Sequence, residues 1–241
     1  MNQNLHTFKT PEELAGKFAD QLMDWVANHS GNEFHLAISG GKTPDLLFVA
    51  LAEQYTDSEL WQKVHFWWVD ERMVPPADPE SNFGVVERLL FSRINLPAEN
   101  IHRVKGENDP EAEALSYSGH IREKLERTNG WPVFQLIILG MGDDGHTASI
   151  FPDQLNLLDS DQICTVATHP VSGQKRVTLT GKAINNAEKI CFLLTGSNKA
   201  HRLMQIFSQS PEAKKLPASY IAMANGSLEW YVDEAAVQKL G

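Results

Sequence analysis

Short apolar runs alternate along the chain with longer segments in which apolar residues recur at helical spacing. The run at residues 134–139 (FQLIIL) is continuously apolar, which is typical of a strand covered on both faces of a parallel sheet. Similar runs predict further strands over residues 34–39, 64–69, 163–167, 176–180, 189–195 and 228–232.

The clearest helix is predicted over residues 11–28, where apolar residues recur on one face after the start signal Thr10-Pro11. Further helices are predicted over residues 44–54, 82–91, 110–128, 181–186 and 197–208. Strands that alternate with helices imply right-handed crossovers and a mainly parallel sheet between helix layers. We therefore expect one α/β domain over residues 1–241.

Composition narrows the class of protein. Of the 241 residues, 21 are Lys or Arg and 31 are Asp or Glu, giving a net charge of −10 that counts against a nucleic-acid partner. Cys164 and Cys191 are the only cysteines, which excludes a disulfide framework and a four-cysteine zinc site. The sequence has no HExxH motif and its other histidines are scattered, so we expect no metal. No apolar stretch is long enough for a membrane span or a signal core, so a cytoplasmic protein without a membrane partner is expected.

Ligands of open α/β sheets bind beyond the carboxyl ends of the strands, so the residues there are the first candidates for a site. Ser39-Gly40-Gly41-Lys42-Thr43-Pro44 lies between a predicted strand and a predicted helix. The glycines permit a sharp turn, and Thr43 and Pro44 fit the N-cap and the first helical position. Free N–H groups at such a helix start favour phosphate, although the segment also fits a plain strand-to-helix turn.

A charged segment, Asp70-Glu71-Arg72, follows the aromatic strand at residues 64–69. Such a run is often only a solvated loop start. As a functional segment it supplies the carboxylate of Asp70 and the guanidinium of Arg72, whose fixed charge and planar donors suit an oxyanion. Ser81 and Asn82 are interpreted as caps of the next helix.

The most informative segment is Gly140-Met141-Gly142-Asp143-Asp144-Gly145-His146, at the end of the apolar run FQLIIL. Imidazole exchanges protons near neutral pH, so His146 is a candidate acid or base. Asp144 either orients the imidazole, handles a proton itself or caps the sheet edge. A helix-capping or exposed histidine is the plain alternative, but three glycines favour close approach of a ligand.

Two cations lie further along the chain. Arg176 opens the predicted strand RVTLT, and Lys199 lies in a strand-to-helix turn. Taken alone, either residue is typical of an ordinary charged side chain on the surface. With the Ser39 loop they would complete a phosphate clamp.

The blocks SGGKTP, WVDERMVPPADPESNFG, LGMGDDGHTASIFP and RVTLTGKAINNA, in this order, closely resemble the 6-phosphogluconolactonase family, a relative of the glucosamine-6-phosphate deaminases. The resemblance extends from about Leu36 to the LEWYVDEAA segment. It implies a Rossmann-like three-layer α/β fold, no cofactor and a sugar-phosphate substrate, 6-phospho-D-glucono-1,5-lactone, hydrolysed in the oxidative pentose phosphate pathway.

The resemblance also implies roles for individual residues. His146 matches the residue that activates water, Asp144 a catalytic-pocket aspartate and Arg72 an arginine near the substrate. The residues that match phosphate or substrate ligands are Ser39, Gly40, Gly41, Thr43, Asp70, Arg176 and Lys199. The chain is expected to act as a monomer or a small homo-oligomer on a small molecule.

Two alternatives compete with the lactonase. The related deaminases carry a glutamate five residues after the histidine, whereas this chain has Phe151 there, which favours lactone hydrolysis. A sugar-phosphate sensor domain would accompany a DNA-binding module, for which this chain has neither the length nor the basic charge.

The substrate that the resemblance implies is itself an anion. We therefore expect the acidic average of the chain to conceal a local basin of positive charge around Arg72, Arg176 and Lys199.

Overall fold

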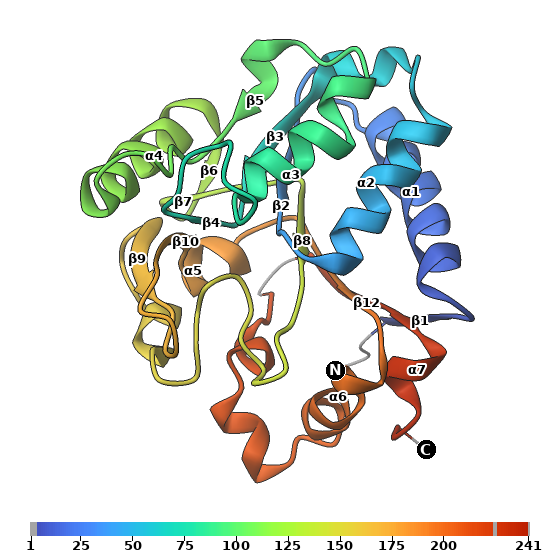
Figure 1. Cartoon of the computed structure of the whole chain (residues 1–241), viewed down its shortest axis with the longest axis vertical. Helices are drawn as coiled ribbons and strands as arrows, with labels where there is room; N and C mark the ends of the chain where they lie inside the picture. Colours follow the sequence, from blue (N-terminus) through green and yellow to red (C-terminus); the bar gives the residue numbers. More distant parts are fainter. Residues whose placement is uncertain (1–3, 224–225, 241) are drawn as a thin grey trace.

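The structure, a computed structural model, describes residues 4–223 and 226–240. A seven-stranded sheet forms its centre, with strand order β1-β12-β11-β8-β2-β3-β5 and parallel pairing throughout. Figure 1 shows α1, α2 and α3 side by side along one side of this sheet and α4 and α5 on the other. The predicted α/β fold with a mainly parallel central sheet between helix layers is confirmed.

The bounds of the elements follow the sequence pattern closely in the middle of the chain. The strands of the central sheet are β1 (Asn4–Phe8), β2 (Phe34–Ile38), β3 (Val64–Trp68), β5 (Ile101–His102), β8 (Leu136–Leu139), β11 (Lys189–Leu194) and β12 (Ser227–Asp233). The helices are α1 (Pro11–Asn28), α2 (Lys42–Gln54), α3 (Asn82–Leu89), α4 (Pro110–Lys124), α5 (Gly181–Asn185), α6 (Ala200–Phe207) and α7 (Glu234–Val237).

The order of the strands places a crevice in the middle of the sheet. After the edge strand β1, the chain forms β2, adds β3 and β5 on one side, then crosses to β8 on the other side of β2 and continues outward to β11 and β12. The direction of winding therefore changes between β2 and β8. Segments that leave the carboxyl ends of these two strands diverge, which is where α/β sheets bind ligands.

Burial explains why the central strands could be read from the sequence. Every residue of β2 and of β8 is buried, so both strands appear in the sequence as nearly continuous apolar runs. The neighbouring Trp67 and Trp68 are both fully buried although they point to opposite faces of β3. Cys164 and Cys191 are free and buried.

A second sheet of three antiparallel strands stands beside the first, in the order β4-β10-β9. It consists of β4 (Asp70–Arg72), β9 (Cys164–Thr168) and β10 (Lys175–Leu179). Strands β9 and β10 were both predicted from the sequence, but they lie in this second sheet and not in the parallel sheet. The charged segment after β3, expected as a loop, is a strand because β10 pairs with it, with Arg176 opposite Arg72.

Several predicted helix boundaries are wrong: α3 ends at Leu89 instead of residue 91, α6 begins at Ala200 instead of residue 197, and two further differences have a clear physical cause. The helix after β2 begins at Lys42, and its N-cap is Gly41 with φ +119°, so Thr43 and Pro44 lie inside the first turn. Only glycine adopts that φ readily, so glycine takes the position predicted for Thr43. The Thr43 hydroxyl is instead hydrogen-bonded to that of Thr195.

The helix predicted over residues 110–128 ends at Lys124. Residues Arg127–Thr128 (β6) pair with Trp131–Pro132 (β7) across a turn at Asn129 and Gly130, both with positive φ. An Asn-Gly pair is a strong hairpin signal that outweighs helix propensity at this point. The edge strand β1 was not predicted, because its exposed, partly polar residues leave no apolar run. Among the described residues, none of the helices has the length and apolar character needed to cross a bilayer.

Three histidines are linked by hydrogen bonds near the amino ends of β3 and β5, and a fourth, His35 of β2, lies against the first of them, His65. Nδ1 of His65 lies 2.9 Å from Nε2 of His102, and Nδ1 of His102 lies 2.9 Å from Nε2 of His120. His35 accepts a 3.1 Å hydrogen bond at Nδ1 from the Trp67 indole. Burial lowers the pKa of His35 to about 4 and that of His102 to about 3, and the neighbouring imidazoles add to the effect.

This group of four histidines makes the fold sensitive to acid. Because the folded pKa values lie below the unfolded value of about 6.5, the stabilising contribution is complete above pH 6.5 and is lost as the pH falls toward 4. Each histidine that stays neutral only in the folded state lowers the free energy of unfolding by about 1.4 kcal/mol per pH unit. Urea unfolding between pH 7 and pH 4.5 measures this slope.

The substitution His102→Gln is expected to reduce that slope by about one proton. The control His201→Gln, at an exposed position of α6, is expected to leave the slope unchanged. Identical slopes for the wild type and His102→Gln contradict the assignment.

Candidate active site

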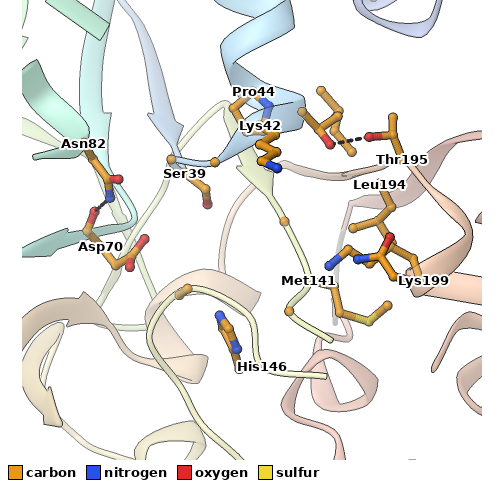
Figure 2. A pocket seen from close by; sticks show the side chains of 18 of the residues that line it. Ser39, Lys42, Pro44, Asp70, Asn82, Met141, His146, Leu194, Thr195 and Lys199 are labelled. Atoms are coloured by element: carbon orange, nitrogen blue, oxygen red, sulfur yellow. Dashed lines mark hydrogen bonds between the residues drawn. The ribbon is translucent and has the colours of Figure 1, made fainter. Parts of the chain in front are cut away.

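A cavity of about 410 Å³ opens at the carboxyl ends of β2, β3, β8 and β11. All but one of the predicted site residues line it, namely Ser39, Gly40, Gly41, Thr43, Asp70, Arg72, His146, Arg176 and Lys199. The exception, Asp144, lies directly behind His146. Figure 2 shows the His146 ring projecting into this cavity, with Asp70 and Asn82 on one wall and Lys199 on the other.

The loop after β2 brings the amino end of α2 to the cavity. Ser39 donates a hydrogen bond of 2.9 Å from its hydroxyl to the carbonyl of Ile138, which ties this loop to β8. The N-cap Gly41 has no side chain, so the first N–H groups of α2 are not capped by one. Uncapped N–H groups at a positive helix end attract an anion.

Asp144 and His146 form a tight pair in the turn after β8. Oδ1 of Asp144 lies 2.6 Å from Nδ1 of His146 and also accepts the backbone N–H of His146 at 3.1 Å. Partial burial raises the pKa of Asp144, but the hydrogen bonds and charge of His146 outweigh it and lower the pKa to about 2. A carboxylate that stays ionised keeps the proton of neutral His146 on Nδ1 and leaves Nε2 as the basic atom.

Phe151 forms the floor behind the imidazole. Its ring centroid lies 4.8 Å from that of His146, and the guanidinium of Arg176 lies over it at 5.7 Å. Phe151 is fully buried. The position where the related deaminases carry a carboxylate therefore holds an apolar ring that packs against both functional groups.

Gly142 gives the imidazole its space. A Cβ at this position would lie 2.2 Å from Nδ1 and Cε1 of His146 and 2.7 Å from Oδ1 of Asp144. We therefore expect Gly142→Ala to push the ring away from Asp144 and to lower turnover at least about 10-fold. The control is Gly119→Ala in α4, where a Cβ meets no atom within 4 Å. Equal activity of the two variants in a turnover assay contradicts this role of Gly142.

Arg72 and Arg176 face each other across β4 and β10 and form a concentrated positive wall. Like charges directly opposite each other in a sheet are destabilising, so a bound anion would stabilise the two facing arginines. Within the described residues, neither arginine has a carboxylate within 4 Å, and the Nε atom of each is buried without a hydrogen-bond partner. Burial lowers the pKa of Arg176, the direction expected for a cation that has lost part of its solvation.

Lys199 is placed differently from the two arginines. Its ammonium lies 2.5 Å from a carboxylate oxygen of the exposed Asp143, which also accepts a hydrogen bond from Asn198. The charge of Lys199 is therefore partly neutralised in this structure. As a ligand for an anion it requires Asp143 to be displaced or to share the ammonium.

Asp70 is fixed on the wall opposite. Its Oδ2 accepts a 2.6 Å hydrogen bond from the Ser149 hydroxyl, and its carbonyl accepts one of 2.9 Å from Nδ2 of Asn82. The prediction that Ser81 caps α3 is confirmed, since its hydroxyl accepts the N–H of Gly84. Asn82 is not the cap but a wall of the cavity, and the sequence analysis missed that position. A helix start needs only one capping residue, and Ser81 fills that role. The adjacent Asn82 was therefore free for another function, and this was the available sequence signal.

Other cavity residues also escaped the sequence analysis as separate candidates. They are Lys42, Thr195 and Asn198, which lie inside the recognised loops but were not singled out. In the described part of the chain, no group of three or more His, Cys, Asp and Glu side chains has the geometry to hold a metal ion. The arrangement can bind an anion along one wall and exchange a proton at Nε2 of His146.

Fold and site together define an α/β protein with a pocket lined by cationic side chains and a carboxylate–imidazole pair at the carboxyl edge of a parallel sheet. The model of one family, glucosamine-6-phosphate isomerases/6-phosphogluconolactonase, matches residues 9–230. The chain belongs to this family.

Similar proteins with more specific names cover from four fifths to nearly all of the chain. A 6-phosphogluconolactonase of Haemophilus influenzae is 44% identical over 238 residues, covering 98% of this chain and 100% of that protein. One of Treponema pallidum is 41% identical over 79% of each chain. The solved structure of a 6-phosphogluconolactonase from Trypanosoma cruzi superposes with a TM-score of 0.89 at 25% identity, covering 99% and 97% of the two chains.

Proposed function

We propose that this chain hydrolyses 6-phospho-D-glucono-1,5-lactone to 6-phospho-D-gluconate. The observation that carries the proposal is the His146 ring, which is held at Nδ1 by Asp144 and projects into a cavity beside two arginines without carboxylate partners among the described residues. A base and an anion-binding wall in one pocket suit an anionic ester. The lactonase relatives agree with this reading.

The phosphate is the anchor of the substrate in this proposal. The amino end of α2 with Ser39, Gly40, Gly41 and Thr43, together with Arg176 and Lys199, surrounds it. The planar guanidinium of Arg176 matches two phosphate oxygens. In the complex, these oxygens replace the water that burial has removed from the guanidinium. Binding at a point remote from the reacting carbon fixes the lactone carbonyl near His146, and such positioning lowers the barrier by several kcal/mol.

The chemical step needs one water and no cofactor. Nε2 of His146 takes a proton from that water as its oxygen bonds to C1 of the lactone, forming a tetrahedral intermediate. The bond between C1 and the ring oxygen then breaks, and Nε2 returns the proton to that oxygen, which becomes the 5-hydroxyl. Asp144 stabilises the imidazolium that exists between the two transfers.

Charge that develops on the carbonyl oxygen also needs a partner. Arg72 stands beside Arg176 on the same wall and supplies a permanent cation for this oxyanion. Asp70, fixed by Ser149, contacts the hydroxyl groups of the sugar. Phe151 offers no group for the additional proton transfers of a deaminase.

Acid release from freshly prepared 6-phosphogluconolactone, above its spontaneous hydrolysis, tests the proposal. Glucosamine 6-phosphate is the control, with ammonia as the product to be measured. We expect rapid acid release and no ammonia. Ammonia release with no effect on the lactone assigns the pocket to the other branch of the family.

The setting of the enzyme is part of the same proposal. We expect one domain over residues 1–241 that acts in the cytoplasm as a monomer or a small homo-oligomer, without a nucleic-acid or membrane partner. The net charge of −10 and two buried free thiols support this setting.

A further inference from the structure

Glu71 lies between two pocket residues and points away from the pocket. Side chains alternate along a strand, so Asp70 and Arg72 of β4 face the cavity while Glu71 faces the start of α3. Only 1% of Glu71 is exposed. A charged side chain is rarely buried to this degree unless it is paired.

Every contact of the Glu71 carboxylate comes from a donor. Oε1 accepts the backbone N–H groups of Arg72 and Asn82, both at 2.8 Å. Oε2 accepts the backbone N–H of Phe83 at 2.7 Å and the Ser81 hydroxyl at 3.3 Å. Four donors around two oxygens satisfy a carboxylate, whereas an amide would turn its own N–H₂ toward some of them.

These contacts fasten β4 to the first turn of α3, and the connection continues to the loop after β2. Asn82, held through its N–H, donates from Nδ2 to the Asp70 carbonyl. Its Oδ1 fits against Gly40 so closely that a Cβ there would lie 2.0 Å away. The Glu71 carboxylate thereby links the backbone of Arg72 and Asp70 to the proposed phosphate loop.

The charge of Glu71 also lies behind the arginine wall. Val177, the residue after Arg176, is paired with Glu71 across the sheet. The negative charges of Asp70 and Glu71 both favour the charged form of Arg176. Burial raises the pKa of Glu71 to about 7, although the N–H groups of Phe83, Asn82 and Arg72 lower it, so the carboxylate form that these donors fit predominates above that pH.

We propose that Glu71 is a positioning residue for the reaction proposed above: without touching the substrate, its carboxylate holds Asp70, Arg72 and Asn82 in place and supports the arginine wall. This inference rests on the proposed function. On one side of β4, Asp70 and Arg72 contact the substrate. On the other side, Glu71 supports them.

The test compares Glu71→Gln with Glu113→Gln. Glu113 is also buried and accepts a backbone N–H, from Lys105, and the Asn108 amide, both at 2.8 Å, but it lies in α4 outside the cavity. Both variants are assayed at a temperature where circular dichroism shows them folded. Kinetics on the phosphorylated lactone and calorimetric binding of 6-phosphogluconate are measured for each.

Glu71→Gln is expected to lower kcat/KM at least 10-fold and to weaken 6-phosphogluconate binding, while Glu113→Gln stays within about twofold of the wild type. Folded Glu71→Gln with kcat/KM and affinity within twofold of the wild type overturns the inference, as does an equal loss in Glu113→Gln. If the wild type binds 6-phosphogluconate but leaves the lactone intact, the proposed function fails, and the comparison of affinities still decides the role of Glu71.

Discussion

His146→Ala is expected to lower kcat by about 10²–10⁴-fold, the usual contribution of a positioned general base. The substitution removes Nε2, the proposed acceptor of the proton of water, but it leaves the arginine wall and the amino end of α2 intact. The affinity for 6-phosphogluconate is therefore expected to change by no more than a few-fold. Stopped-flow acid release gives kcat, and calorimetry gives the affinity.

His201→Ala, at an exposed position of α6, is the matched control and is expected to retain wild-type kcat. Turnover of His146→Ala within threefold of the wild type removes this histidine from the mechanism. A large loss of 6-phosphogluconate affinity in the same variant contradicts the separation of base and anchor, because His146 then contributes to binding.

Arg176→Met is expected to raise KM for the phosphorylated lactone about 10²-fold, since loss of a charge-assisted contact with a phosphate costs a few kcal/mol. The free protein should respond in the opposite direction. Removing one of two facing arginines relieves like-charge repulsion and the desolvation that lowers the pKa of Arg176. The free energy of unfolding is thus expected to stay equal or to increase.

The neighbouring Lys175→Met provides the control, because Lys175 lies on the same strand, is exposed and does not line the cavity. Initial-rate kinetics and urea unfolding are measured for both variants. An unchanged KM for Arg176→Met contradicts its role as a phosphate ligand. So does an equal rise in KM for glucono-1,5-lactone, which has no phosphate.

The sequence carries the central sheet and the loops of the site because both are local. The buried strands β2 and β8 are nearly continuous apolar runs, and glycine-rich turns follow them directly. Parallel strands place their carboxyl ends at one edge of the sheet, so the proximity of the Ser39 loop and the His146 turn could be predicted from the sequence. The resemblance to a known family then added the expected chemistry.

What the sequence concealed depends on pairing between distant segments. β4 is three residues long and charged, so only its pairing with β10 makes it a strand and sets Arg72 opposite Arg176. Glu71 looks like a solvated charge until the first turn of α3 surrounds it with donors. The ion pair of Lys199 with Asp143 likewise joins two loops that the sequence shows only as separate turns.

The wrong cap of α2 has a different origin. Thr43 and Pro44 fit the start signals of a helix, yet the backbone turns at Gly41 with a φ that favours glycine. The helix gains two residues at its start, and its amino end moves to the cavity without a side-chain cap. That change strengthens the interpretation of this loop as an anion site.

The comparison of 6-phosphogluconolactone with glucono-1,5-lactone in one wild-type assay tests the central claim most directly, because it joins water attack to the phosphate anchor. Spontaneous hydrolysis of each lactone is measured in parallel and subtracted. We predict kcat/KM at least about 10²-fold higher for the phosphorylated lactone. Equal values for the two lactones, or no acceleration of either above its spontaneous rate, contradict the account.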